Sequence, residues 1–305
     1  MQTDLTLIIN LSPGDADYAE LTAGALANAH RDQAKEIILI VDDTIAPFSD
    51  FYDHQKKYKQ PDYTKKLAKV TAAANQLKAD GLVDQVLLLA RYSSEKELHK
   101  KYLNNRIKQS HDFRGAPITA YLAGFEACKT LYLVRYDGDM LLHQTAADWV
   151  LTGINLLNQH PDCIAVSPRP SPPLPNQQAD IEIDPTCWFS TRCTLFDRLK
   201  VMTTTPFIYG KYRRELLLRK WMNKTYPPAL ETMLFHRMKD CGLKNYYLLN
   251  NNGWLLHPEK KDEVFVQLLP EIIAEIAKGN YPEEQANQET LELNAWQKYL
   301  QVTLV

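Results

Sequence analysis

The sequence predicts an α/β protein with a mostly parallel central sheet and helices on both faces of it. Four apolar runs alternate with helical patterns, and nearly continuous apolar runs are typical of strands buried on both faces. The length of 305 residues suits one large domain with ample core. The four runs are LTLIINL at 5–11, EIILIVDD at 36–43, VLLLARY at 86–92 and LYLVRY at 131–136.

The connecting segments carry turn and helix signals in the order that such a sheet requires. A turn at 12–15 leads into a helical pattern at 16–30, and further helices are expected at 65–79 and 117–129. Later in the chain, YYLLN at 246–250 and GWLL at 253–256 are strand-like. Two helical patterns follow at 265–279 and 289–305, separated by a turn at 279–282. These last helices would pack on the sheet or form a dimer contact.

Composition excludes several classes of protein. A formal net charge of −2 argues against a nucleic-acid binder, which needs an excess of Lys and Arg. Residues 5–11 lack the basic lead and cleavage site of a signal peptide, and no apolar run reaches membrane-spanning length, so we expect a cytoplasmic protein. The five cysteines are odd in number without a CxxC pair, which indicates neither a disulfide framework nor a zinc site.

Two acidic pairs close two of the predicted strands. Asp42 and Asp43 end the second run, and Asp137 and Asp139 follow the fourth in the stretch DGD. Ligands of parallel sheets bind beyond the carboxyl ends of the strands, so both pairs should share a cleft. Residues two apart in an extended segment point to one side, and Gly138 would leave room for a ligand. Carboxylates suit Mg²⁺ or Mn²⁺, with a diphosphate as remaining ligand. The alternative is an ordinary Asp-Gly turn.

These blocks, together with GAPITAYLAGFEACKTLYLVRYDGDM, LETMLFHRMKDCGL and GWLLHP, resemble the GT-A glycosyltransferases, most closely family 2. The resemblance implies a GT-A catalytic domain over 1–260, with a Rossmann-like nucleotide-binding half (1–142) and an acceptor half (143–260), and a helical extension over 261–305. It implies transfer of a sugar, with inversion, from a UDP- or GDP-sugar donor to a hydroxyl of a glycan, lipid-linked or protein acceptor.

The same resemblance assigns roles to individual residues. Asp137 and Asp139 form the DxD motif and hold a divalent cation, Mn²⁺ or Mg²⁺, to which His257 would be a third ligand. An imidazole ligand favours manganese. Trp188 would stack on a sugar or fill the core, and Arg114 would pair with a phosphate or remain a solvated surface arginine. The residues expected to contact substrate are Asn10, Leu11, Asp42, Asp43, Arg114, Gly115, Asp137, Gly138 and Trp188.

Glu231 is the candidate catalytic base. An inverting transfer needs a general base to take the proton of the acceptor hydroxyl. The family pattern is an acidic pair followed by Leu, Arg and Gly, and Glu231 has these at 234, 237 and 242. Leu230 stands where the first acid is expected, which departs from the pattern. Glu231 also suits the start of a helix after two prolines, and the two interpretations are compatible.

Two further segments are less specific. The stretch 167–185 is dense in Pro and polar residues, so it is expected to be a long loop, either an acceptor lid or an insertion. The block 205–226 gathers Lys and Arg among aromatics, which suits an anionic acceptor, peripheral contact with a membrane, or simply a solvated face.

Two alternatives to an active glycosyltransferase stay open. The chain contains no GxSxG, GxxxxGK[ST], GxGxxG or HExxH motif. A sugar nucleotidyltransferase would also place carboxylates beside a nucleotide, but a basic, Gly-rich loop is expected after its first strand, and this chain has the acidic NLSPGDAD there. A catalytically inactive nucleotide-binding scaffold remains compatible with Leu230.

Overall fold

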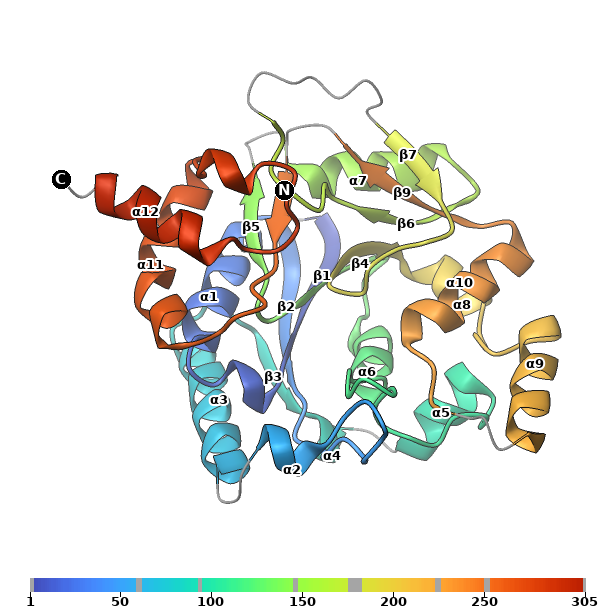
Figure 1. Ribbon diagram of the computed structural model, residues 1–305. Helices are drawn as coiled ribbons and strands as arrows, with labels where there is room; N and C mark the ends of the chain where they lie inside the picture. Colours follow the sequence, from blue (N-terminus) through green and yellow to red (C-terminus); the bar gives the residue numbers. More distant parts are fainter. Residues whose placement is uncertain are drawn as a thin grey trace.

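The computed structural model describes residues 3–58, 62–92, 95–144, 148–174, 183–222, 226–249 and 253–303. In these ranges the chain forms an eight-stranded sheet in the order β3-β2-β1-β4-β8-β6-β9-β7 and a two-stranded sheet of β10 and β5 (Figure 1). The strands are β1 (Thr3–Leu11), β2 (Ala34–Val41), β3 (Gln85–Leu88), β4 (Tyr132–Asp137), β5 (Leu141–Gln144), β6 (Cys163–Ser167), β7 (Ile183–Thr186), β8 (Cys193–Asp197), β9 (Lys244–Leu248) and β10 (Gly253–Leu256).

The mostly parallel sheet that the sequence predicts is confirmed. Strand β1 pairs in parallel with β2 and β4, and β2 pairs in parallel with β3. Strand β8 runs antiparallel to both β4 and β6, so β6 again follows the direction of β4, as does its parallel neighbour β9. Strand β7 is an antiparallel edge. The carboxyl ends of β1, β2 and β4 therefore meet at one edge of the sheet.

Helices cover both faces of the large sheet, as predicted. The helices are α1 (Ala19–His30), α2 (His54–Lys57), α3 (Asp62–Ala79), α4 (Leu89–Tyr92), α5 (Glu95–Leu103), α6 (Thr119–Ala127), α7 (Trp149–Gln159), α8 (Arg198–Thr203), α9 (Gly210–Trp221), α10 (Leu230–Cys241), α11 (Glu263–Ala277) and α12 (Leu293–Thr303), with short 3-10 turns at Pro13–Asp15 and Glu283–Gln285.

The alternation of side chains along the strands creates two separate cores. Leu7 and Ile9 of β1 pack with α1, α3 and α7, whereas Ile8 packs with α5, α6, α8 and α10 on the other face. Successive strand residues point to opposite faces, so nearly every position of such a strand is buried. This explains why β1 and β2 are apolar without alternation.

The strand expected over 86–92 is wrong in its second half. Pairing with β2 stops at Leu88, and the chain turns into α4. The Oδ1 atom of Asp43 accepts a hydrogen bond of 2.8 Å from the backbone N–H of Ala90, at the start of that helical turn. A carboxylate that caps the first N–H groups stabilises a helix start, so Asp43 ends the strand.

The C-terminal helices pack on the domain itself, which is one of the two arrangements expected. A third core joins Phe265, Leu269 and Ile272 of α11 to Tyr18 beside α1 and Leu141 of β5. Helix α12 contributes Trp296 and Leu300 to the same core. Figure 1 shows α11 and α12 beside α1 and the small sheet.

The long loop expected over 167–185 is partly a strand. Residues 175–182 of it lie outside the described ranges, and its end forms β7, which pairs with β9 through Ile183 and Pro185. A proline has no backbone N–H to donate, and it is tolerated here because β7 is an edge strand. In the described residues no helix is both long and apolar enough to span a membrane. All five cysteines are free.

Candidate functional site

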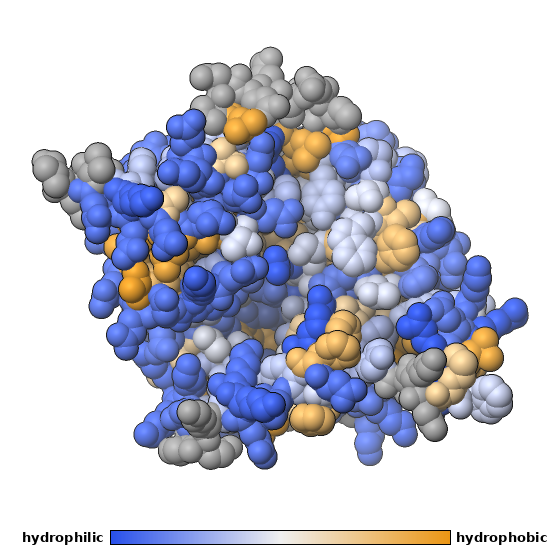
Figure 2. Space-filling view, viewed as in Figure 1, coloured by the Kyte–Doolittle hydropathy of each residue, from blue (hydrophilic) through white to orange (hydrophobic). Residues whose placement is uncertain are grey.

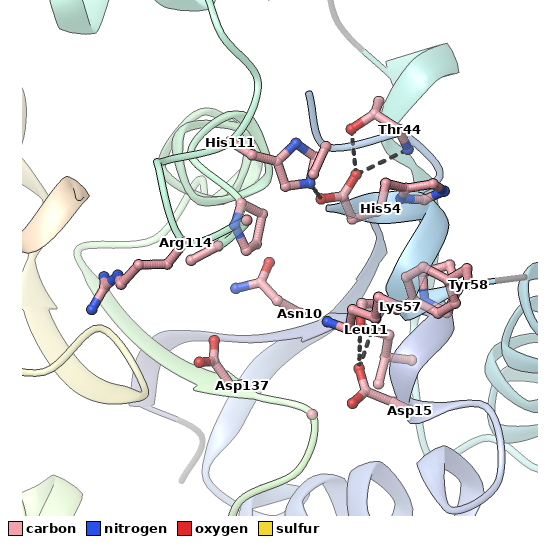
Figure 3. A pocket seen from close by; sticks show the side chains of 18 of the residues that line it. Asn10, Leu11, Asp15, Thr44, His54, Lys57, Tyr58, His111, Arg114 and Asp137 are labelled. Carbon is pink, nitrogen blue, oxygen red and sulfur yellow. Dashed lines mark hydrogen bonds and ion pairs between the residues drawn. The ribbon is translucent and has the colours of Figure 1, made fainter. Parts of the chain in front are cut away.

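A pocket of about 300 Å³ lies at the carboxyl ends of β1, β2 and β4. We call it the first pocket (Figure 3). Sequence reasoning expected ligands at this edge, and the pocket collects the acidic residues of two strands there. Its expected lining residues are Asn10, Leu11, Asp42, Arg114, Gly115, Asp137, Gly138 and Asp139. Those not expected include Asp15, Thr44, Tyr52, His54, Lys57, Tyr58, Tyr63, His111, Tyr121 and Lys261.

Asn10 and Asp137 face each other across the floor of the first pocket. They are register partners at the ends of β1 and β4, and in Figure 3 both side chains point into the same space. The amide of Asn10 is buried, yet neither its oxygen nor its nitrogen has a hydrogen-bond partner in the described structure. A buried polar group without a partner is costly, so this amide is available to a ligand.

Asp137 has a permanent cationic partner. Its Oδ1 atom accepts hydrogen bonds from Arg135 Nη2 at 3.0 Å and from the Tyr121 hydroxyl at 3.2 Å. The guanidinium of Arg135 is fully buried and stacks on the Tyr121 ring at 3.3 Å. Burial raises the pKa of Asp137 to about 6, against the effect of Arg135, and the neighbouring carboxylates Asp139 and Glu231 add to the rise.

Asp139 lies against a histidine and a lysine from the C-terminal part of the chain. Its Oδ2 atom lies 3.3 Å from His257 Nε2 and accepts a short hydrogen bond from Lys261 Nζ. Burial alone would raise the pKa of Asp139, but the hydrogen bond of His257 and the charge of Lys261 hold it well below its usual range. The other oxygen, Oδ1, is buried without a hydrogen-bond partner in the part of the chain that is described.

The pairing of β5 with β10 brings His257 to Asp139. Leu141 directly follows the DGDM stretch and pairs with Leu256, so the next residue, His257, lies beside Asp139. The backbone N–H of His257 bonds to Glu289 O at 3.1 Å, which holds this chain end in place. Residues far apart in sequence thus meet through a two-stranded sheet.

The geometry expected for the DGD stretch is wrong in two respects. Residues 138 and 139 form a turn, closed by a 3.2 Å hydrogen bond from Met140 N to Asp137 O, so the extended same-side argument does not apply. The space beside Gly138 is also filled. A Cβ atom there would lie 2.3 Å from Leu11 Cδ2 and 2.9 Å from Asn10 O. Gly138 permits close packing on β1 and leaves no extra room for a ligand.

Asp42 and Asp43 go to different places. Asp42 is buried and lines the first pocket, where its Oδ1 accepts from Thr44 N and Oγ1 and its Oδ2 lies 3.0 Å from His111 Nε2. His111 is therefore a buried partner of Asp42. Asp43 caps Ala90 and is absent from the pocket lining described.

Arg114 and Gly115 belong to a tight loop built on Asp112. The buried carboxylate of Asp112 accepts from the backbone N–H groups of Arg114 and Ala116 and from the Arg114 guanidinium at 2.9 Å. Gly115 has φ +78°, and a Cβ atom there would lie 2.5 Å from the Tyr52 ring. Only glycine fits this position without strain. Half of the Arg114 side chain remains exposed to solvent.

A second pocket, of about 550 Å³, adjoins the first. Arg114 lines both, and the contact between Asp139 of the first and His257 of the second joins them. Trp188 lines the second pocket with 52% of its surface exposed, so the alternative that it fills the core is wrong. The other lining residues include Asp184, Arg192, Glu231, Tyr247 and Glu289.

Glu231 lies in the first turn of α10, as expected, and lines the second pocket. Its Oε1 accepts a hydrogen bond of 2.5 Å from Thr191 Oγ1, and its Oε2 lies 3.7 Å from Arg114 Nη2. Leu230 is buried in the core beneath α10. A side chain at position 230 thus points away from the pocket, and Glu231 is the carboxylate that this helix start presents.

Sequence reasoning missed Lys261, Arg135, Tyr121, Thr191 and the tyrosines of the first pocket. Lys261 stands in HPEKK, four residues after His257, and Arg135 stands two residues before the DGD stretch, so both carried a weak signal. Thr191 carried none, because its meeting with Glu231 depends on the fold bringing the segment before β8 to the first turn of α10.

No family model matches this chain, and no curated protein sequence matches it. Among solved structures, it is similar to the galactosyltransferase LgtC in complex with donor and acceptor sugar analogues, with 12% identity, 92% of this chain and 98% of that chain covered, and a TM-score of 0.41. It is similar to TarS of S. aureus in complex with UDP-GlcNAc, at 10% identity over 93% of this chain and 69% of that chain, TM-score 0.40. It is also similar to a UDP-glucose pyrophosphorylase complexed with UDP-glucose, at 10% identity over 99% of this chain and 100% of that chain, with a TM-score of 0.41. At these TM-scores the likeness carries no functional argument.

Proposed function

We propose that this protein is a glycosyltransferase of the GT-A type. The first pocket would hold a nucleotide-diphosphate sugar and the second an acceptor hydroxyl. One observation carries the proposal: two pockets share Arg114 and meet at the contact between Asp139 and His257, with Asp137 on one side of the junction and Glu231 on the other.

The lining of the first pocket supports a nucleotide-diphosphate ligand. Tyr52, Tyr58 and Tyr63 gather near Asp42 and offer flat apolar surface with polar groups for a nucleoside. Lys57 and Arg114 line the same pocket and supply positive charge for a diphosphate. The amide of Asn10, which has no hydrogen-bond partner among the described residues, adds a donor group and an acceptor to the same lining.

A divalent cation, Mn²⁺ or Mg²⁺, is part of the proposal. Asp137, Asp139 and His257 would hold it, and Asp139 Oδ1, buried without a hydrogen-bond partner in the described structure, suits a metal ligand. Among the described residues, however, no three His, Cys, Asp or Glu side chains form a cluster fit for a metal. The ammonium group of Lys261 contacts Asp139 and would have to move. A bound cation would stabilise the charge of the leaving diphosphate.

Three side chains of this protein would have separate roles in the reaction. The oxygen of the acceptor hydroxyl would form a bond to the anomeric carbon, while the bond from that carbon to the diphosphate breaks. Glu231 would take the proton of that hydroxyl as the new bond forms. Thr191 would orient the carboxylate of Glu231. Arg114, between the pockets, would bind the departing phosphate through its planar guanidinium. Attack from the face opposite the leaving group gives inversion.

The test is release of nucleoside diphosphate from a panel of UDP- and GDP-sugars, with and without glycan acceptors, in Mn²⁺, in Mg²⁺ and in chelator. Asp139→Ala should abolish turnover, and Glu231→Gln should strongly lower it. The control is Asp80→Asn, which changes an exposed acid just after α3. The Asp80 carboxylate accepts a hydrogen bond from Gln76, and this change should leave turnover unchanged. Pyrophosphate release from a nucleoside triphosphate and a sugar phosphate, dependent on Asp139, would instead show a nucleotidyltransferase. Binding without any turnover would indicate the inactive scaffold.

A further inference from the structure

Helix α9 carries an exposed surface that neither pocket uses. We define the α9 surface by four apolar side chains and five cations. They are Leu217, Leu218, Trp221 and Met222, with Lys211, Arg213, Arg214, Arg219 and Lys220. Figure 2 shows hydrophobic side chains at its lower right, where Figure 1 places α9.

Only one side of α9 is attached to the domain. Tyr212 is buried and stacks on His236 with ring centroids 4.0 Å apart, and Leu216, four residues later, packs on the core beneath. Residues four apart lie on the same side of a helix. Arg214, Leu218 and Trp221 follow the opposite side at spacings of four and three residues, so a second, outward stripe of the helix combines charge with apolar groups.

The outward stripe exposes more apolar surface than an ordinary solvated helix does. Trp221 is 84% exposed and Leu218 is 60% exposed, and Leu217 and Met222 beside them are exposed as well. Single exposed apolar residues need no explanation, but a contiguous group rimmed by charges indicates an interaction site. A tryptophan at such a rim is typical of interfaces with lipid.

The charges on α9 are strongly one-sided. Five cations face one anion, Glu215, which is already paired with Arg219 at 2.6 Å. In the described parts of the chain, no carboxylate lies within ion-pair distance of Arg213, Arg214 or Lys220. The whole chain has a net charge of −2, so this helix concentrates positive charge against the average. An anionic partner is electrostatically complementary to it.

A groove of about 190 Å³ continues the α9 surface toward the first pocket. Ile107 and Leu217 line it as apolar groups, and Arg106, Lys108 and Lys220 line it as cations. Tyr226 lines the same groove and lies 5.8 Å, between ring centroids, from Phe51, which is itself 62% exposed. Apolar and basic groups therefore extend from the end of α9 to the loop that enters α2.

We propose that the α9 surface docks on an anionic lipid bilayer. The cations would lie at the phosphates of the lipid headgroups, and Leu218 and Trp221 would enter the boundary with the acyl chains. A second copy of the chain would bring the same cations into opposition, which is unfavourable. This proposal does not rest on the proposed function, because docking needs neither donor nor acceptor.

Co-sedimentation with vesicles tests the proposal. The intact protein is mixed with vesicles of phosphatidylcholine alone or of equal parts phosphatidylcholine and phosphatidylglycerol, at low and high salt. The protein should bind only the anionic vesicles and should be released by salt. Each basic residue near an anionic surface contributes about fivefold to binding, so Arg214→Glu combined with Lys220→Glu should weaken binding roughly 30-fold or more.

Two further variants separate charge from insertion. Leu218→Ser combined with Trp221→Ser should also release the protein, although every cation stays. Lys65→Glu combined with Lys78→Glu makes the same change of charge on exposed positions of α3, on another side of the domain, and should leave binding intact. Anionic vesicles should shift the tryptophan emission to shorter wavelength in the wild type, and Trp221→Phe should remove that shift while Trp188→Phe should not.

Several results would overturn the proposal. Absence of binding to anionic vesicles would do so, as would equal binding to neutral ones. An equal loss in the α3 control would show that net charge alone acts. A dimer in solution that Leu218→Ser with Trp221→Ser dissociates would assign the surface to a second copy. Melting temperatures of all variants should match the wild type, because the changed side chains are exposed.

Discussion

The hydroxyl of Thr191 donates a hydrogen bond of 2.5 Å to Oε1 of Glu231 and so links the segment before β8 to the first turn of α10. The other carboxylate oxygen lies 3.7 Å from the Arg114 guanidinium, which is beyond hydrogen-bond range. Glu231 is thus fixed through one oxygen, while the other can accept a proton from an acceptor in the second pocket.

This relationship predicts a specific kinetic effect of changing Glu231. Glu231→Gln should lower kcat about 10²–10⁴-fold, the usual contribution of a general base, with little change in donor affinity. The amide keeps an oxygen for Thr191, so the melting temperature should stay the same. Thr191→Val should lower kcat by a smaller factor, roughly fivefold to tenfold, because it removes only the orienting bond. Equal rates of sugar transfer to the acceptor by wild type and Glu231→Gln would rule out the role of base.

A pair of glycines tests the shape of the first pocket. Gly115 and Gly81 both have positive φ, +78° and +75°, but only at Gly115 would a Cβ atom meet a neighbour, the Tyr52 ring at 2.5 Å. Both changes to Ala should cost about 1–2 kcal/mol in free energy of unfolding through backbone strain. Gly115→Ala should also weaken nucleotide binding, because Tyr52 lines the pocket. Calorimetric titration with the nucleotide should separate them, and equal binding by both would contradict the assignment.

His30 should make stability fall in acid. It is fully buried, with Nε2 2.9 Å from the Tyr136 hydroxyl, and burial lowers its pKa to about 4 from the ordinary 6.5. As the pH falls, His30 therefore becomes protonated in the unfolded chain at a higher pH than in the folded protein. The stability that neutral His30 contributes is complete above about pH 6.5 and is lost as the pH falls toward 4, in total about 3 kcal/mol.

Urea denaturation of wild type and His30→Asn at several pH values measures this effect. The variant starts less stable, since it loses packing, but its free energy of unfolding should fall less between about pH 7 and about pH 4, by roughly 2–3 kcal/mol. Parallel pH curves for the two proteins would show that His30 does not titrate as described.

The local pattern of apolar residues was enough to predict the central sheet, whereas contacts between distant parts of the chain decided where one of its strands ends. Buried parallel strands need apolar side chains on both faces, so the runs at 5–11 and 131–136 could be recognised. The strand over 86–92 failed because Asp43, distant in sequence, caps Ala90. Long-range contacts of this kind leave no local signal.

Some residues of the candidate site could be predicted from the sequence, and others depend on contacts between distant parts of the chain. Asp137, Asp139 and Glu231 follow from their places at strand and helix ends, as does the shared cleft. The role of Gly138 could not be predicted, because the side chain that fills its space, Leu11, comes from another strand. The pairing of Lys261 with Asp139 required the packing of the C-terminal segment against the domain.

The most direct test of the central claim is a thermal-shift titration with UDP, GDP and their sugar conjugates, with and without Mn²⁺, on wild type and Asp139→Asn. A ligand at about 100 times its Kd stabilises the folded state by about 2.7 kcal/mol, enough to raise Tm by several degrees. We predict a shift with one nucleotide that Mn²⁺ enhances and that Asp139→Asn removes. A rise in Tm that is the same with and without Mn²⁺ and in both proteins would contradict the cation site. Absence of a rise in Tm with every nucleotide-sugar would contradict the proposed function as a whole.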